Sequence, residues 1–569
     1  MKKKIIIFFT AIIVLIISCT KVLDQQPKGS LGGDALLNKE AAEALVIACY
    51  SILDNKDPQP VWGWGNVGSN LWNNPSMWES GDLRSDDCYK GGGGTDDVAE
   101  YGTIELGIVQ PTNAAIGVIW KGHYVSISRC NKALQILNQL TDAGFPLRTQ
   151  RIAEVKVLRG FYYMRMKQLF RTFPYVDETI AVGKEGEVPN DLTETQLWDK
   201  ILTDVSAGVN IPFDGLDKGR VNKYVAYSLV AKVNMFRNKY AEALAAADQV
   251  VSSGKYSLVP DIEKLYSDPS VEHTENIFAI EASVGGGAEG SVRFNWADIW
   301  CAPSNGPYGG GDGFQRPSQN LVNAFQVDAN GLPLLDTYNN SDVLPDDITT
   351  AVDPRLDHAI GRPGIRWKDY TTGPQTHGWA RSEVIYGSYT RKKNLIYVNS
   401  SLRATAPTDF PWAGGALNFP FIKLTEMMLI KAECLVELNQ NLDVARDLVN
   451  QIRSRAKNTP YVKSFTNPAI NAANYNIGLY PAVGWTQAYA RKAVRFEMRL
   501  EFCLEGHRFF DLLRWGIAKS TVDAYRNVEK TKRTYLAAGT YIAPKIDYYP
   551  IPQNEIDISR GVLKQDPNY

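Results

Sequence analysis

Residues 495–516 read RFEMRLEFCLEGHRFFDLLRWG, and this stretch decides the fold of the chain. Its apolar residues recur at helical spacing, so we predict a helix from about Tyr489 to Glu505 that ends at Gly506. Carboxylates and guanidinium groups form two further stripes on this helix. Charges at such spacing usually pair. We therefore interpret these charged residues as ion pairs that hold the fold: Glu497, Arg499, Glu505, Arg508, Asp511 and Arg514.

The composition is that of a globular protein. The chain has 569 residues, of which 44% are hydrophobic and 22% charged, with 61 Lys and Arg against 62 Asp and Glu. The net charge of −1 argues against nucleic acid as the main partner, because a protein that binds a polyanion needs a cationic face. No two cysteines form a C-x-x-C pair, so the sequence contains neither a zinc ribbon nor a redox motif of that kind.

The start of the chain predicts export. Three lysines, Lys2–Lys4, precede an almost unbroken apolar run at residues 5–17. This run is shorter than the about 20 residues of a membrane-spanning helix, and it has the length of a signal-peptide core. It ends in Ser18-Cys19, which resembles a bacterial lipobox. We therefore predict that residues 1–18 are removed and that Cys19 carries a lipid that anchors the mature protein to a membrane.

Helical periodicity recurs along the chain. It predicts single helices at residues 116–140, 152–170 and 193–209, and helix pairs at 224–251 and 421–456. The two pairs break at residues 237–239 and 439–441, and small side chains occupy their crossing points. This spacing resembles the tetratricopeptide repeat. The predicted fold class is mainly α, with a scaffold of tetratricopeptide-like helix pairs and a large loop-rich part.

The loop-rich part covers three long segments, residues 54–112, 260–316 and 332–418. Loops of this length in a compact protein are functional or disordered, and their many aromatic residues argue against disorder. Short strands are predicted within them at residues 277–281, 384–389 and 395–398.

Templates for enzymes are absent from the sequence. The five histidines form no H-E-x-x-H motif, and neither a Walker A nor a G-x-S-x-G motif occurs. A G-x-G-x-x-G match at residues 63–68 follows no predicted strand, so it does not indicate a dinucleotide site. We therefore predict no catalytic residues, no cofactor and no metal-binding residues, while calcium sites with oxygen ligands on the Asp-rich loops stay open because they leave no firm spacing pattern.

The aromatic residues of the loops predict a binding surface instead. A sugar ring has an apolar C–H face on which an indole stacks, and hydroxyl groups that Asp, Asn and Arg bind. Three clusters have this composition, at residues 62–87, 295–314 and 367–386. Packing beneath a loop is the alternative for each Trp taken singly, but the repeated combination of indole and polar side chains favours a binding surface.

Several stretches together resemble the SusD/RagB family, the surface glycan-binding lipoproteins of Bacteroidetes. Besides the signature at 495–516, the matching stretches are LDQQP at 23–27, LRGFYY at 158–163 within 153–175, GRV at 219–221, SGKY at 253–256, DPRL at 353–356 and YPIP at 549–552. The resemblance covers nearly the whole chain. Glycine runs at 91–94 and 309–311 depart from the family pattern and leave the shape of the pocket open.

The resemblance implies a surface-exposed lipoprotein of the outer membrane that is not an enzyme. Such a protein captures an oligosaccharide and delivers it to a SusC-like TonB-dependent transporter. It also implies a division into a signal peptide at 1–18, an N-terminal part with helical repeats at 19–285 and a C-terminal part at 286–569, the two parts being intertwined into one compact unit.

The family places its ligand on loops after the first helix and near the middle of the chain, which correspond to the first two aromatic clusters. On this basis we predict that Trp72, Trp78, Trp296, Trp300 and Tyr308 stack on sugar rings. We predict that Asn73, Asp82 and Arg84 bind sugar hydroxyls.

Three alternatives remain open at this point. One is an oligopeptide-binding member of the same importer type, and another is a glycoside hydrolase that uses a pair of loop carboxylates. The last is a structural module whose helix pairs bind a partner protein and no small ligand.

Overall fold

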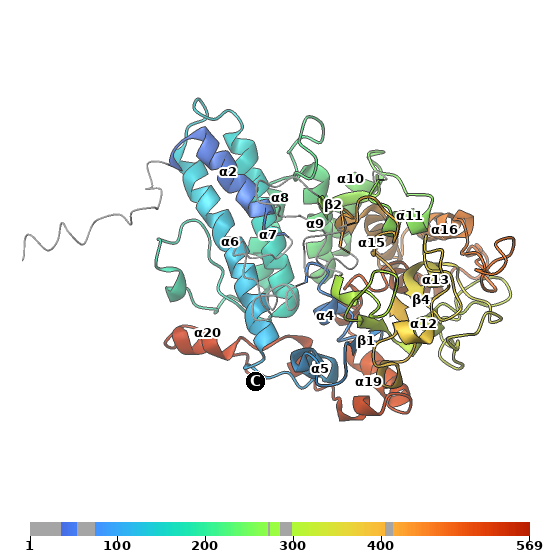
Figure 1. Ribbon diagram of the computed structural model, residues 1–569. Coiled ribbons are helices and arrows are strands. Elements are labelled where there is room, and N and C mark those ends of the chain that lie inside the picture. The colour runs from blue at the N-terminus through green and yellow to red at the C-terminus, as the bar shows by residue number, and fades with distance from the viewer. Residues whose placement is uncertain (1–35, 54–73, 271–273, 285–298, 404–413) are drawn as a thin grey trace, which may run out of the picture.

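The computed structural model of the chain describes residues 36–53, 74–270, 274–284, 299–403 and 414–569 (Figure 1). The described part is mainly helical, as predicted. Its longer helices are α2 (Lys39–Tyr50), α6 (Ala114–Gln139), α7 (Arg148–Leu169), α8 (Glu194–Ser206), α9 (Lys223–Phe236), α10 (Tyr240–Val251), α15 (Leu424–Glu437), α16 (Leu442–Asn458), α17 (Gln487–Glu501) and α19 (Ala518–Glu529).

Shorter elements connect these helices. The short helices are α4 (Trp78–Gly81), α5 (Ala99–Leu106), α11 (Ile262–Ser267), α12 (Gln319–Ala324), α13 (Arg355–Ala359), α14 (Glu383–Tyr386), α18 (Arg508–Arg514) and α20 (Gln553–Ile558). The strands are β1 (Cys88–Gly91), β2 (Asn276–Ile280), β3 (Phe314–Pro317), β4 (Ile360–Gly361), β5 (Thr390–Arg391) and β6 (Phe419–Lys423). Each sheet in the described residues has two antiparallel strands: β1 with β3, β2 with β6, and β4 with β5.

The helices form a row in which each packs on the next, from α6 through α7, α8, α9 and α10 to α15, which also packs on α16 and α17. Figure 1 shows α2, α6 and α7 on one side of the molecule and the short elements β1, β4, α12 and α13 on the other. Among the described residues, no helix combines the length and the apolar character that crossing a membrane requires.

Local chemistry explains why the predicted helix pairs break where they do. Asn238 lies between α9 and α10 with φ 55°, and Asn439 and Asn441 lie between α15 and α16 with φ 53° and 45°. Asn tolerates this left-handed conformation better than most residues, so it ends one helix and allows the next to turn back. The predicted capping box also forms, since the Thr193 hydroxyl accepts from the Gln196 amide and the Gln196 side chain accepts from the Thr193 amide.

Of the three predicted strands, only the one at residues 277–281 forms, as β2 (Asn276–Ile280). The strand predicted at 384–389 is wrong, because Ser382 and Gly387 have φ of 52° and 82° and enclose the helical turn α14. The strand predicted at 395–398 is also wrong. Asn394 has φ 57°, and the Tyr397 amide donates to the Ser267 carbonyl rather than to a neighbouring strand. The apolar side chains there, Leu395, Ile396 and Val398, fill a small core beneath the loops.

The signature helix is shorter than predicted. α17 ends at Glu501 rather than Glu505, because Leu504 has φ 62° and the chain turns there. Gly506 then lies against the turn that contains α4. A Cβ atom on Gly506 would come within 1.9 Å of the Ser76 carbonyl oxygen, and one on Gly81 would come within 1.8 Å of the Gly506 carbonyl oxygen. Both positions therefore require glycine.

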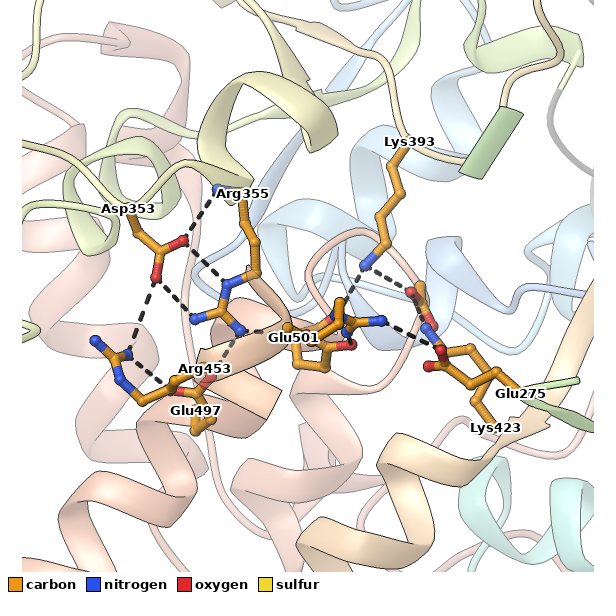
Figure 2. Close-up of polar contacts among 10 residues, drawn as sticks. Glu275, Asp353, Arg355, Lys393, Lys423, Arg453, Glu497 and Glu501 are labelled. Carbon is orange, nitrogen blue, oxygen red and sulfur yellow. Dashed lines mark hydrogen bonds and ion pairs between the residues drawn. The ribbon is translucent and has the colours of Figure 1, made fainter. Parts of the chain in front are cut away.

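A buried network of ten charged side chains surrounds α17 (Figure 2). Its five cations are Arg355, Lys393, Lys423, Arg453 and Arg455, and its five carboxylates are Glu275, Asp353, Glu497, Glu501 and Glu505. Arg355 is at one centre, with Nη2 2.8 Å from Asp353 Oδ2 and Nη1 2.6 Å from Glu497 Oε1 and 3.2 Å from Glu501 Oε2. Lys393 and Lys423 both contact Glu505 Oε1, at 2.5 and 2.7 Å.

The remaining signature charges pair as well. Arg499 contacts Asp86 and Asp87 at 3.0 and 2.8 Å, and Arg508 contacts Asp86 at 2.8 Å. Arg514 pairs with Glu433 at 2.6 Å and with Asp511 at 2.8 Å. All six signature charges therefore form ion pairs, as interpreted, and that these pairs hold the fold stays a prediction.

Removing the Arg355 guanidinium should destabilise the protein strongly. Arg355→Met leaves Asp353, Glu497 and Glu501 buried with too little positive charge, and breaking a buried pair of this kind costs about 3–5 kcal/mol. Urea unfolding, followed by circular dichroism, measures the difference.

The matched control is Lys492→Met on α17. Lys492 pairs with Asp336 at 2.8 Å, but the two side chains are 57% and 69% exposed. An exposed pair contributes at most about 1 kcal/mol. Equal losses in the two variants would contradict the structural role of the buried network.

Candidate functional site

Three loop segments that are far apart in the sequence meet at one surface. We call this surface the loop face and define it as residues 91–97, 303–313 and 376–386. The Gly92 amide donates to the Gly313 carbonyl at 3.1 Å, extending the β1–β3 pairing. Asn305 Nδ2 donates to the Gly378 carbonyl at 2.8 Å and joins the second segment to the third.

An ion triad lies where the three segments meet. Arg381 Nη1 is 3.0 Å from Asp312 Oδ1 and 3.5 Å from Asp97 Oδ2, so each segment contributes one charge. The side chains of Arg381, Asp97 and Asp312 are 39%, 33% and 19% exposed. Burial raises the pKa of Asp312 to about 6, with the Asp97 charge adding to the shift and Arg381 opposing it. The triad therefore offers carboxylate acceptors and guanidinium donors to a ligand at the surface.

Glycine makes this close approach sterically feasible. A Cβ atom on Gly93 would lie 2.7 Å from Arg381 Nη2, and one on Gly92 would lie 2.8 Å from Asp97 Oδ2. Gly92 also has φ 79°, which side chains rarely allow. The glycine run at 91–94 therefore brings the backbone up to the triad and leaves no side chain in front of it.

Two buried cations hold the loops that carry the triad. Lys90 Nζ donates to the Gly94 carbonyl at 2.8 Å and to the Asp97 carbonyl. It therefore connects the two ends of the glycine-rich turn. Arg316 is fully buried on β3 and donates to the carbonyls of Arg381, Gly387 and Tyr389. Both cations therefore position the triad without contacting solvent themselves.

His377 joins a further loop to the loop face. Its Nδ1 is 2.5 Å from Glu383 Oε1 and its Nε2 is 3.2 Å from Asp346 Oδ2. The hydrogen bond with Glu383 raises the pKa of His377, and the bond with Asp346 adds to this shift. His377 therefore connects the loop at Asp346 to α14.

The predicted residues of the first aromatic cluster lie inside the protein where the structure describes them. Trp78 is 1% exposed, with its ring centroid 5.0 Å from that of Tyr101 and 6.3 Å from that of Phe314. Asp82 Oδ2 accepts from Gln315 Nε2 at 2.6 Å and from the Gly506 amide at 2.9 Å.

Arg84, which belongs to the same cluster, is also buried. Its guanidinium lies over the rings of Phe509 and Tyr549, with centroid distances of 4.0 and 4.5 Å. Trp78, Asp82 and Arg84 therefore support the loops from within, and their role as ligand contacts stays a prediction.

The second and third clusters share a small core behind the loop face. Tyr308 is 2% exposed, its hydroxyl donates to the Ile396 carbonyl at 2.6 Å, and its ring centroid is 6.3 Å from that of Trp367. Trp379 lies between Trp367 and the half-buried Tyr370, at centroid distances of 5.6 and 5.8 Å. Trp300 is 4% exposed. For Tyr308 and Trp300 too, ligand contact stays a prediction.

The other predicted residues, Trp72, Asn73, Trp296 and the lipidation site Cys19, lie outside the described residues. The chain has 13 Trp, and eight of them are described. Seven of these eight are buried, and the eighth, Trp515, is half-buried. No described indole therefore lies fully open to solvent.

Sequence reasoning missed Asp97, Asp312 and Arg381, which the fold brings together from three segments. The signal that could have found them is the pair of glycine runs at 91–94 and 309–311, since glycine-lined loops often allow close approach to a ligand. The described residues contain no group of three or more His, Cys, Asp or Glu side chains arranged to hold a metal ion.

Known sequences and structures resemble this chain along nearly its whole length. A family model described as the SusD family matches residues 274–569. A curated SusD-like protein of Formosa agariphila is 22% identical over 589 aligned residues, which cover 100% of this chain and 99% of that protein.

Two solved structures illustrate the likeness in fold. A SusD-like carbohydrate binding protein from Bacteroides fragilis has a TM-score of 0.70 at 21% identity, covering 94% of this chain and 99% of that one. Surface glycan-binding protein A from Bacteroides thetaiotaomicron, solved in complex with laminarihexaose, has a TM-score of 0.63 at 23% identity, covering 94% of this chain and 100% of that one.

Buried carboxyls behind the loop face predict how stability depends on pH. Burial raises the pKa of Glu79 and Asp82 to about 8 and that of Glu105 to about 7. At these three carboxyls the folded state binds more protons than the unfolded chain between about pH 4 and pH 8, so their contribution to the free energy of unfolding should fall as pH rises through this range. Scanning calorimetry at about pH 5 and pH 8.5 measures the change.

Glu79→Gln should reduce this loss of stability at high pH, because the variant removes one of the buried ionisations. The control is Glu187→Gln, whose side chain is 65% exposed and should leave the pH profile as in wild type. Glu505 has the opposite effect at low pH, because Lys393 and Lys423 overcome its burial and lower its pKa to about 2. Its contribution to the free energy of unfolding is lost as pH falls toward 2. A melting temperature that rises steadily from pH 5 to pH 8.5 would disprove the assignment.

Proposed function

The chain belongs to the SusD family, and on that premise we propose that it is a carbohydrate-binding lipoprotein that captures an oligosaccharide at the cell surface. We further propose that it delivers this ligand to a SusC-like TonB-dependent transporter in the outer membrane and that it is not an enzyme. The observation that carries the proposal is the loop face, where three loops of the predicted binding region bring one ion triad to the surface.

The chemistry of the triad suits sugar hydroxyls. A hydroxyl group can donate to Asp97 or Asp312 and accept from Arg381 at the same time, and hydrogen bonds with charged partners are stronger than neutral ones. Because the two carboxylates already orient the guanidinium, little side-chain freedom is lost when a ligand binds. Solved relatives of this fold described as carbohydrate-binding or laminarin-binding support the same ligand class.

Aromatic contacts complete the proposed site. We assign sugar stacking to Trp72 and Trp296, with Asn73 as a hydrogen-bonding partner. Trp78, Asp82, Arg84, Trp300 and Tyr308 belong to the same site in this proposal, and their burial suggests that they act by supporting its loops. Stacking on an exposed ring adds apolar contact that the triad by itself does not supply.

A binding titration tests the site. We expect saturable heat when the mature protein is titrated with a neutral oligosaccharide such as laminarihexaose. Arg381→Ala should weaken binding at the loop face at least tenfold, since loss of a charged hydrogen-bonding partner costs about 1.5–3 kcal/mol. Asp312→Asn should weaken binding less, because it retains an acceptor oxygen.

The matched control for this titration is Arg446→Ala. Arg446 pairs only with its neighbour Asp447 among the ion pairs of the described residues, and it lies on α16, outside the loop face. If a mixed peptide digest gives saturable heat and sugars give none, the ligand is an oligopeptide. Release of reducing ends from laminarihexaose on long incubation would show an enzyme instead.

The membrane anchor has its own test. If Cys19 carries the lipid, radioactive palmitate should label the full-length protein expressed in a bacterium with a lipoprotein pathway, and Cys19→Ala should abolish the label. Cys130→Ala is the control, because that thiol is buried between helices of the core. Palmitate label that persists in Cys19→Ala would contradict anchoring at this residue.

A further inference from the structure

A second concave site lies on the helical side of the molecule. It is a cavity of about 990 Å³, including its open mouth. Its walls come from the α8–α9 connection, the residues after α10, and strand β2, and none of its lining residues belongs to the loop face. We call it the hairpin pocket. Without the open mouth its volume is about 290 Å³, which is at the lower limit of small-molecule sites, about 300 Å³.

Two stretches that sequence analysis singled out, and that the loop face does not use, converge on the hairpin pocket. Gly219 and Arg220 come from the GRV stretch, and Lys255 and Tyr256 come from the SGKY stretch. Arg220 is held in place by Glu43 and Glu154 and forms a fixed part of the wall. Gly219 has φ 83°, and a Cβ atom there would lie 2.9 Å from Glu281 Cγ.

One wall of the pocket is aromatic. The rings of Phe213, Tyr224 and Tyr256 pack edge to face on one another, with centroid distances of 5.3, 5.9 and 5.8 Å. Phe213 and Tyr256 line the pocket and are half-buried, so part of each ring faces the open space. Rings fixed in this way offer apolar surface at little cost in side-chain entropy.

Polar groups face the same space. In the described part of the chain, Asn276 Oδ1 is buried in the pocket wall without a hydrogen-bond partner. A buried acceptor of this kind is costly unless a ligand or water donates to it. Glu281 adds a second acceptor, which already takes a hydrogen bond from Asn418 Nδ2 at 2.8 Å.

The charges around the pocket balance one another. Lys218 is 3.4 Å from Glu281, and Lys255 is 3.5 Å from Asp214. These pairs are long, and all four side chains are at least 36% exposed, so they can exchange partners with a ligand at small cost. Arg220, the third cation of the wall, pairs with Glu43, Glu154 and Asp217, so every cation that lines the pocket already has a carboxylate partner and a neutral ligand is favoured.

We propose that the hairpin pocket is a second carbohydrate site, which binds a short neutral oligosaccharide with one sugar face against Phe213 and Tyr256 and a hydroxyl donating to Asn276 Oδ1. Lys255 lies 5.0 Å from the Phe213 ring centroid and donates to a hydroxyl or ring oxygen of the same sugar. The proposal takes its ligand class from the proposed function but rests on a different set of residues. Two sites on one chain raise the avidity for a long glycan that can reach both.

Titration calorimetry with laminarihexaose as the probe tests this proposal on the mature chain. Wild type should bind two equivalents. Phe213→Ala and Asn276→Ala, tested separately, should each lose one equivalent or weaken it at least tenfold, while Arg381→Ala should retain the hairpin-pocket equivalent. Phe465→Ala is the matched control, because this half-buried ring lies outside both sites.

Asn276→Ala keeps the test valid if Phe213→Ala fails to fold, since the Asn276 oxygen that it removes bonds to no described group. Suppose that wild type binds one equivalent, which Arg381→Ala loses and which Phe213→Ala and Asn276→Ala retain. This result would overturn the second site and support the loop face. A single equivalent lost only in Phe213→Ala and Asn276→Ala would support the hairpin pocket and contradict the loop face. Absence of binding to laminarihexaose, maltohexaose and cellohexaose would overturn both.

Discussion

Charge balance in the interior is the constraint on which the rest of this structure depends. Five cations and five carboxylates meet around α17. They come from α13, β6, α16, α17 and the turn after it, the residue before β2, and the loops at Asp353 and Lys393. A charge taken out of water costs several kcal/mol unless it finds its partners. Each of these segments must therefore reach its place for the others to be stable there. Because every member of the network needs its partners, the network constrains the positions of the helices and loops that carry it.

Buried groups in the interior also fix the geometry of the loops around the ion triad. They contain little regular structure, and buried cations instead hold their backbone carbonyls: Arg316 holds the segment from Arg381 to Tyr389, and Lys90 holds the glycine-rich turn. A surface built in this way can change its exposed side chains without losing its support. The same division explains how the exposed chemistry can differ within one fold, because function is carried by the site and not by the scaffold.

Sequence periodicity predicted the helices well, because helical spacing and the asparagines at the breaks are local properties. That the signature charges form ion pairs was also predictable, but most of their partners were not, because Glu497, Arg499 and Glu505 pair with segments far away in the sequence. The strand at 384–389 failed because Ser382 and Gly387 adopt positive φ, which no alternation pattern reveals. The candidate site was only partly predictable. Trp78 and Tyr308 belong to aromatic clusters typical of a binding surface, but they pack inside the protein. Asp312 and Arg381 are 69 residues apart, Asp97 lies still farther away in the sequence, and the three meet only in the folded chain.

The contact between Gly81 and Gly506 has a consequence for the order in which the chain folds. Synthesis proceeds from the N-terminus, so the turn at α4 emerges long before its partner near the C-terminus exists. Until residue 506 arrives, the carboxylates of Asp82, Asp86 and Asp87 lack the amide and guanidinium groups that later satisfy them. The segment around α4 therefore stays solvated until then. It packs only when the last tenth of the chain has been synthesised. Truncation near the C-terminus thus removes the closing piece of the whole molecule rather than a peripheral tail.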